Sequence, residues 1–135
     1  MNTVIFACVH NAGRSQMSAA FFNHMANPAQ ARALSAGTQP GTQVHSIVVE
    51  AMREVGIDLA STRPQLLTLE LAATANLLIT MGCGDECPYV PGLAREDWPL
   101  PDPKGQDIET VRITRDEISA RVQDLLERKH IAPAG

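Results

Sequence analysis

The stretch of sequence that decides the fold is Cys8-Val9-His10-Asn11-Ala12-Gly13-Arg14-Ser15. Its cysteine ends an apolar run, and its arginine stands six residues later, where a helical pattern begins. A loop of this length can wrap round a tetrahedral oxyanion, because backbone N–H groups and the following helix N-terminus favour negative charge. We therefore expect this loop to bind an oxyanion beside a reactive thiol.

The candidate nucleophile is Cys8, whose thiolate form the helix N-terminus and the Ser15 hydroxyl would stabilise. Arg14 can hold two oxygens of the anion in its planar guanidinium. Asn11 is expected to shape the loop, since its side chain can hold the loop open and asparagine tolerates a left-handed backbone. A buried structural cysteine is the alternative interpretation, and the complete loop motif favours catalysis. The residues predicted to bind the anion are Val9, His10, Asn11, Ala12, Gly13, Arg14 and Ser15.

Composition places the chain among ordinary globular proteins. The 135 residues fit one domain, 1–135, that is long enough to bury a core. A net charge of −4 gives no support for nucleic-acid binding, and the apolar runs are too short to cross a membrane. The three cysteines, an odd number, argue against a secreted disulfide framework. We therefore expect a cytoplasmic, monomeric protein with reduced thiols.

Apolar periodicity predicts strands that alternate with helices. The predicted strands are 3–8, 32–35, 75–80 and a short one near 96–98. The predicted helices are 14–26, 44–55, 111–126 and a short helical turn at 69–73. Residues 132–135 are expected to form a frayed tail. This order predicts an α/β fold, a three-layer α/β/α sandwich with a four-stranded parallel sheet.

Three motifs follow directly after predicted strands: Cys8, the segment Ser35–Thr38, and Cys83. In parallel sheets, ligands bind at the carboxyl ends of the strands. The topology therefore predicts that these motifs meet at one edge of the sheet.

Cys83 and Cys87 form a second cysteine motif, Cys-Gly-Asp-Glu-Cys. This spacing differs from a two-residue zinc knuckle, and no histidine cluster follows to complete four ligands. Two idle loop cysteines are the alternative, but Gly82 and Gly84 favour a segment that can move. A disulfide needs α-carbons within about 7 Å, so such a segment could bring Cys83 first to Cys8 and then to Cys87.

These motifs resemble the low-molecular-weight tyrosine phosphatase superfamily and, within it, the arsenate reductases that use an internal cysteine relay. The resemblance spans most of residues 3–127 and implies the fold of that superfamily. It is carried by Cys8–Met17, Ser35–Thr38, the Cys83 and Cys87 pair, and Trp98–Pro103.

The resemblance implies that Asp102 is the general acid, although Asp-Pro dipeptides are also common in ordinary turns. In the implied reaction Cys8 attacks arsenic, and Asp102 protonates the departing hydroxyl. Cys83 then attacks Cys8 and releases arsenite, and Cys87 attacks Cys83. Thioredoxin reduces the final disulfide, and no metal or organic cofactor takes part.

Several positions depart from the family pattern. Gly13 stands where many relatives have a further cysteine, and Ala19 aligns with a glutamate that binds potassium in some of them, so we expect no metal site. The spacing between Cys83 and Cys87 is shorter than in thioredoxin-linked relatives and is similar to that of a group of relatives, some of which use mycothiol.

Two other functions remain open. A tyrosine phosphatase would need only Cys8, Arg14 and Asp102, but Gln16 replaces the usual proline of phosphatases, and no tyrosine follows Asp102. An arsenite-binding or metal-sensing module would need only the three thiols. Turnover of arsenate with a thiol reductant separates the enzyme from the sensor.

Overall fold

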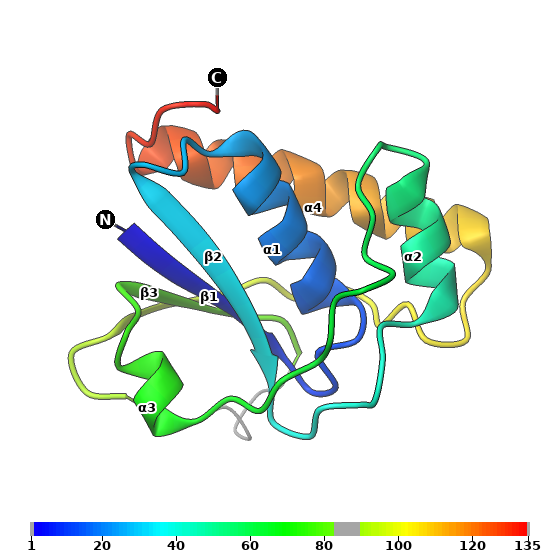
Figure 1. The fold of residues 1–135 in the computed structure, drawn as a ribbon, viewed down its shortest axis with the longest axis horizontal. Coiled ribbons are helices and arrows are strands. Elements are labelled where there is room, and N and C mark those ends of the chain that lie inside the picture. The colour runs from blue at the N-terminus through cyan, green and yellow to red at the C-terminus, as the bar shows by residue number, and fades with distance from the viewer. Residues whose placement is uncertain (1, 83–89, 135) are drawn as a thin grey trace.

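The structure, a computed structural model, describes residues 2–82 and 90–134 and contains one parallel sheet (Figure 1). Its strands lie in the order β2-β1-β3-β4, and each neighbouring pair is parallel. The strands are β1 (Asn2–Cys8), β2 (Ala31–Gly37), β3 (Leu77–Thr80) and β4 (Ala94–Asp97). The helices are α1 (Arg14–Met25), α2 (Ser46–Arg53), α3 (Leu69–Ala72) and α4 (Ile108–Arg128). The predicted four-stranded parallel sheet is confirmed.

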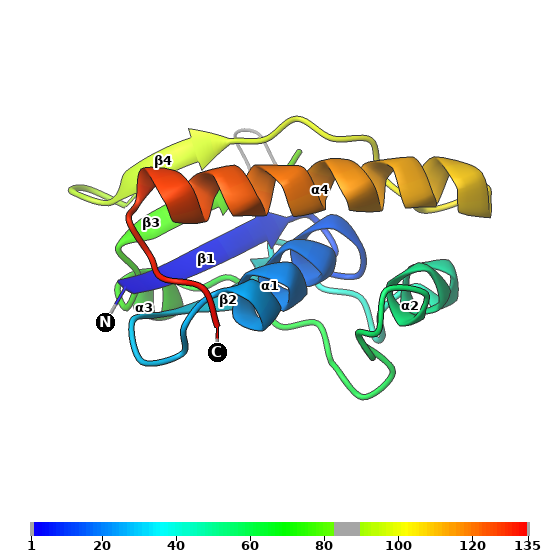
Figure 2. The same cartoon turned by 90° about the horizontal axis from the view of Figure 1, so that it is seen from above.

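The inner strand β1 is buried on both faces, as its unbroken apolar sequence predicts. Val4, Phe6 and Cys8 join the core formed with α1 and α4, whereas Ile5 and Ala7 pack on the side of α3. Figure 2 shows α1 and α4 side by side along the sheet. The three-layer sandwich is therefore confirmed, with a third layer that consists of the single turn α3 and its adjoining loops.

The carboxyl ends of the inner strands meet at one edge. Cys8 pairs with Gly37 at the end of β2, and Ala7 pairs with Thr80 at the end of β3. A β-carbon on Gly37 would lie 2.5 Å from the carbonyl oxygen of Val9, so only glycine allows this close approach. The predicted convergence of strand ends is thus confirmed for Cys8 and for the segment 35–38.

The prediction of a frayed tail is wrong for residues 132–134. Pro133 forms an antiparallel bridge with Ala26, and the Ala134 N–H donates to the Met25 carbonyl at 2.7 Å. The Asn27 N–H donates to the Ala132 carbonyl at 2.9 Å. The tail is ordered because the turn after α1 offers backbone groups that need partners.

The helices α2 and α4 are joined by a cluster of ion pairs. The Glu54 carboxylate accepts hydrogen bonds from Arg112 at 2.6 Å and from Arg115 at 2.8 Å. Hydrogen bonds from these two arginines lower the pKa of Glu54 from its usual 4.5 to about 2.

Among the described residues, no helix combines the length and the apolar character needed to cross a membrane.

Candidate active site

The loop between β1 and α1 turns five consecutive carbonyl groups outward. In a planar trans peptide the N–H of the next residue points the opposite way, so the N–H groups of residues 9–13 point into the loop. Those of residues 10–13 donate to no other described residue. The outward carbonyls of Cys8, Val9, His10 and Ala12 accept from the N–H groups of Thr38, Gln39, Gly41 and His45, and that of Asn11 accepts from Gln16 Nε2.

The Cys8 sulfur lies at the base of this loop and is buried, with 2% of the residue exposed. Its Sγ is 2.9 Å from the Ser15 Oγ. Asn11 Nδ2 donates to the same Ser15 Oγ at 2.7 Å. A thiolate can only accept a hydrogen bond, so the Ser15 hydroxyl donates to the sulfur once Cys8 is ionised, and this bond stabilises the negative charge.

Asn11 holds the loop in shape from a fully buried position. Its backbone has a φ of 51°, a left-handed conformation that asparagine tolerates. Its Oδ1 accepts from the Gln65 N–H at 2.9 Å and from Gln16 Nε2 at 3.2 Å. Asn11 therefore joins the loop to α1 and to a segment more than fifty residues away.

Arg14 is the first residue of α1, and its guanidinium faces the strand ends. Nη1 donates to the Leu100 carbonyl at 3.0 Å, and Nη2 lies 3.8 Å from Asp102 Oδ2. The buried Nε has no hydrogen-bond partner among the described residues. A buried donor without a partner costs about 1–3 kcal/mol. An oxyanion held by the loop would supply the missing acceptor, so the site fits an anionic ligand.

Gly82, two residues after the end of β3, lies against the guanidinium of Arg14. Its φ is +95°, and a β-carbon on it would lie 2.5 Å from Arg14 Nη1. Only a residue without a side chain fits at this place. Gly82 immediately precedes Cys83, and both Cys83 and Cys87 lie outside the described residues.

Asp102 lies on the loop between β4 and α4, with 43% of its side chain exposed. Its Oδ1 accepts the Lys104 N–H at 3.0 Å. The loop starts from a fixed point, because Trp98 is buried with its ring centroid 5.5 Å from that of Phe6. The structure thus places the carboxylate of Asp102 beside Arg14.

His45 precedes α2 and borders the same site. Burial lowers its pKa below 6.5; the Asp102 carboxylate opposes that shift, and the positive charge of Lys104 adds to it, as does His10. The imidazole is therefore neutral at pH 7.

A family model described as low molecular weight phosphotyrosine protein phosphatase matches residues 3–132. The chain belongs to this family. The resemblance carried by the Cys8 loop and by the segment around Asp102 is thereby confirmed, and so is the fold that it implied.

Within the low molecular weight phosphatase family, the chain is similar to proteins named for arsenate reduction. A protein of Halobacterium salinarum, whose name assigns it provisionally to the arsenate reductases, is 39% identical over 90% of this chain and 89% of its own length. The glutaredoxin arsenate reductase of a Synechocystis species is 31% identical over 95% of this chain and 98% of its own length.

A solved structure shows the same likeness. The thioredoxin-dependent arsenate reductase of Corynebacterium glutamicum superposes with a TM-score of 0.81 and 35% sequence identity over 95% of this chain. This chain spans 61% of the length of that protein.

Several residues of this low molecular weight phosphatase site escape prediction from sequence. Gln65, Leu100 and His45 contact the loop or Arg14 through backbone groups, and no local pattern marks a backbone contact. Gln16 carries one signal, because it replaces the proline that phosphatases of this family have. Its side-chain amide turns out to cap the Asn11 carbonyl.

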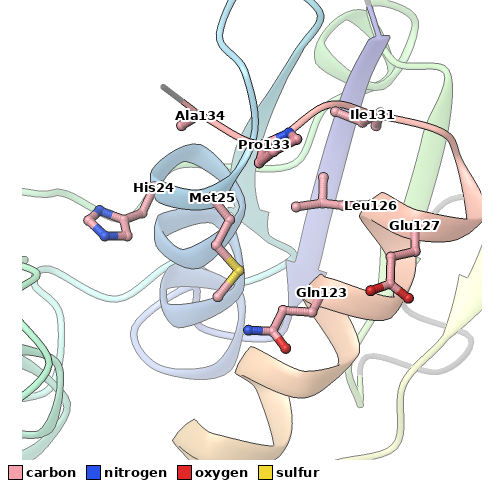
Figure 3. A pocket seen from close by; sticks show the side chains of 8 residues that line it. All are labelled: His24, Met25, Gln123, Leu126, Glu127, Ile131, Pro133 and Ala134. Carbon is pink, nitrogen blue, oxygen red and sulfur yellow. The ribbon is translucent and has the colours of Figure 1, made fainter.

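A cavity of about 430 Å³ lies at the other end of α1, between α4 and the C-terminal tail (Figure 3). Its lining residues are His24, Met25, Gln123, Leu126, Glu127, Ile131, Pro133 and Ala134. His24 comes ten residues after Arg14, which places it about 15 Å along the helix axis. The cavity is therefore separate from the Cys8 loop.

Proposed function

We propose that this protein reduces arsenate to arsenite and that Cys8 is the nucleophile. The observation that carries the proposal is a loop whose five carbonyls all accept from groups outside it, around a buried Cys8 sulfur that lies 2.9 Å from the Ser15 hydroxyl. The arsenate reductase names of relatives that match nearly the whole chain support the choice of arsenate.

In the first step the Cys8 thiolate attacks arsenic(V), and an S–As bond forms. The loop N–H groups and the Arg14 guanidinium hold the arsenate oxygens and stabilise the charge that builds up on them. An As–O bond breaks, and Asp102 gives its proton to the leaving hydroxyl, which departs as water. The product is an arsenate ester of the Cys8 sulfur.

Two thiolate exchanges complete the reduction. The Cys83 thiolate attacks the Cys8 sulfur, and the electron pair of the S–As bond passes to arsenic, which leaves as arsenite. The Cys87 thiolate then attacks Cys83 and frees Cys8, so the enzyme ends with a Cys83–Cys87 disulfide. A dithiol protein returns two electrons and two protons to this disulfide.

The proposed reductant is thioredoxin, the one named for the Corynebacterium glutamicum protein. The Synechocystis relative is named for glutaredoxin, so the reductant differs within this set of relatives. Mycothiol is the alternative low-molecular-weight reductant, and it would need Cys8 alone.

Hydrolysis of phosphate esters is the second candidate function, because Cys8, Arg14 and Asp102 suffice for it. The described residues favour small esters over phosphotyrosine. The four aromatic side chains among them are all buried and offer no exposed ring at the site: Phe6, Phe21, Phe22 and Trp98.

The test is turnover of arsenate with thioredoxin, thioredoxin reductase and NADPH. Cys8→Ser should abolish both NADPH consumption and the hydrolysis of a small aryl phosphate, since both begin at one sulfur. Cys83→Ser and Cys87→Ser should keep the hydrolysis and lose repeated reduction of arsenate. Cys87→Ser should also accumulate a Cys8–Cys83 disulfide, visible by peptide mass spectrometry.

Each contrary result has a definite meaning. Turnover by Cys8→Ser would place the nucleophile elsewhere. Full thioredoxin-coupled activity of Cys87→Ser would refute the three-cysteine relay. Activity of both relay variants with mycothiol, and none with thioredoxin, would identify the alternative reductant.

A further inference from the structure

Gly13, the last residue before α1, lies directly under the ring of Pro103. A β-carbon built on Gly13 would be 2.5 Å from Pro103 Cγ and 3.2 Å from Pro103 Cδ. Carbon atoms in contact prefer about 3.5–4.0 Å. The proline ring therefore occupies the space that a side chain at position 13 would need.

A second glycine beside the loop, Gly41, lacks such a close approach. Gly41 borders the same loop, since its N–H donates to the His10 carbonyl at 2.9 Å. A β-carbon on Gly41 would meet nothing nearer than 3.9 Å. Room for a side chain therefore exists beside the loop at Gly41 and is absent where Pro103 covers it.

Pro103 directly follows Asp102 in the chain, so the contact of Pro103 with Gly13 limits how far the backbone of Asp102 can move. The other contacts of this segment reach Arg14: the Leu100 carbonyl at 3.0 Å and Asp102 Oδ2 at 3.8 Å. Both of those contacts involve the end of a long side chain, which can swing. The contact between the proline ring and the Gly13 backbone is the stiff one, because neither partner has a rotatable side chain.

We propose that Gly13 is a positioning residue for the general acid, and that its missing side chain sets how closely Asp102 approaches the anion over Cys8. The inference rests on the proposed role of Asp102. A methyl group at position 13 would have to displace Pro103, and Asp102 with it, by about 1 Å to reach normal carbon contact. A misplacement of that size in a catalytic group can cost about 100-fold in rate.

The experiment is a double-mutant cycle between Gly13→Ala and Pro103→Ala, with Gly41→Ala as the matched control. Pro103→Ala removes the two atoms that lie too close to the added methyl and leaves His45 Cδ2, which is in ordinary contact at 3.7 Å. We expect Gly13→Ala to lower arsenate turnover by about 10- to 100-fold in the wild-type background. We expect less than a twofold further effect in the Pro103→Ala background, and less than a twofold effect of Gly41→Ala.

A second measurement separates positioning from general damage. Protonation by an acid matters most for basic leaving groups, so Gly13→Ala should slow a phenyl phosphate far more than a dinitrophenyl phosphate. The rate at which iodoacetamide alkylates Cys8 should stay within twofold of wild type, because the nucleophile has not moved. Equal losses on both esters would overturn the proposal.

Folding and the role of Asp102 are controlled separately. If Gly13→Ala unfolds the protein but the double variant folds with the activity of Pro103→Ala, the clash with Pro103 is confirmed. If both backgrounds unfold, or lose activity equally, the proposal is wrong. If Asp102→Asn impairs turnover while Gly13→Ala does not, only the inference about Gly13 fails; normal Asp102→Asn turnover removes the acid role itself.

Discussion

The Cys8 loop and the Asp102 loop face each other across the anion site, and they are held in opposite ways. In the Cys8 loop five carbonyls have hydrogen-bond partners, and Asn11 makes three further bonds from a fully buried position. The Asp102 side chain is 43% exposed, accepts one backbone N–H, and lies 3.8 Å from Arg14. We therefore expect anion binding to depend on a loop held by many hydrogen bonds, whereas proton donation would depend on a side chain held by few.

The largest effect should follow from a change inside the rigid loop. Arg14→Lys keeps the charge but loses the planar fork, so arsenate turnover should fall by about 100-fold or more. The melting temperature should change little, because the guanidinium makes one backbone hydrogen bond. Steady-state kinetics and thermal unfolding measure the two effects, and wild-type kinetics would place the anion elsewhere.

An intermediate and selective effect should follow from a change in the Asp102 loop. Asp102→Asn keeps the shape of the side chain and removes the proton donor, so turnover should fall by about 100-fold. Protection of Cys8 from alkylation by phosphate should persist, since the loop N–H groups and Arg14 are untouched. Loss of that protection would mean that Asp102 shapes the anion site, and the two loops would no longer differ as described.

Only part of the Cys8 loop can be predicted from the sequence. The strand ending at Cys8, the helix beginning at Arg14 and the left-handed Asn11 follow from local patterns of polarity and backbone preference. The partners that hold the loop come from distant segments, among them Gln65 and His45. They donate through backbone N–H groups, which almost any residue type could supply, so no sequence pattern marks them.

The misjudged tail has a similar cause. Ala, Pro and Gly carry no apolar anchor, so residues 132–134 look frayed from composition. Their order comes from main-chain hydrogen bonds with Met25 and Asn27, which only the packing of α4 beside α1 makes available. The third layer, by contrast, was predicted, because the short helical turn expected at 69–73 is α3.

The smallest effect on turnover should come from Glu54→Gln, which changes the ion pairs between α2 and α4 outside both loops. The Glu54 carboxylate is stabilised by Arg112 and Arg115, and its pKa is about 2 when folded, against 4.5 when exposed. This stabilisation is fully present above pH 4.5 and is lost as the pH falls toward 2. Thermal unfolding of wild type and Glu54→Gln should therefore differ most at neutral pH and converge in acid.

Activity gives the control for that prediction. Arsenate turnover of Glu54→Gln at neutral pH should stay within twofold of wild type, because the ion pairs between α2 and α4 do not touch Cys8, Arg14 or Asp102. A strong loss of turnover would show that the position of α2, through His45, governs the site.

The bridge between Pro133 and Ala26 also determines where on the molecule a tag or a fused protein would be attached. Both described chain ends, Asn2 and Ala134, lie at the amino-terminal edge of the sheet (Figure 1). The seven residues of β1 separate that edge from Cys8 by about 20 Å. A tag, an electrode linker or a fused reductase joined at either end would therefore leave the mouth of the site open to a docking redox protein.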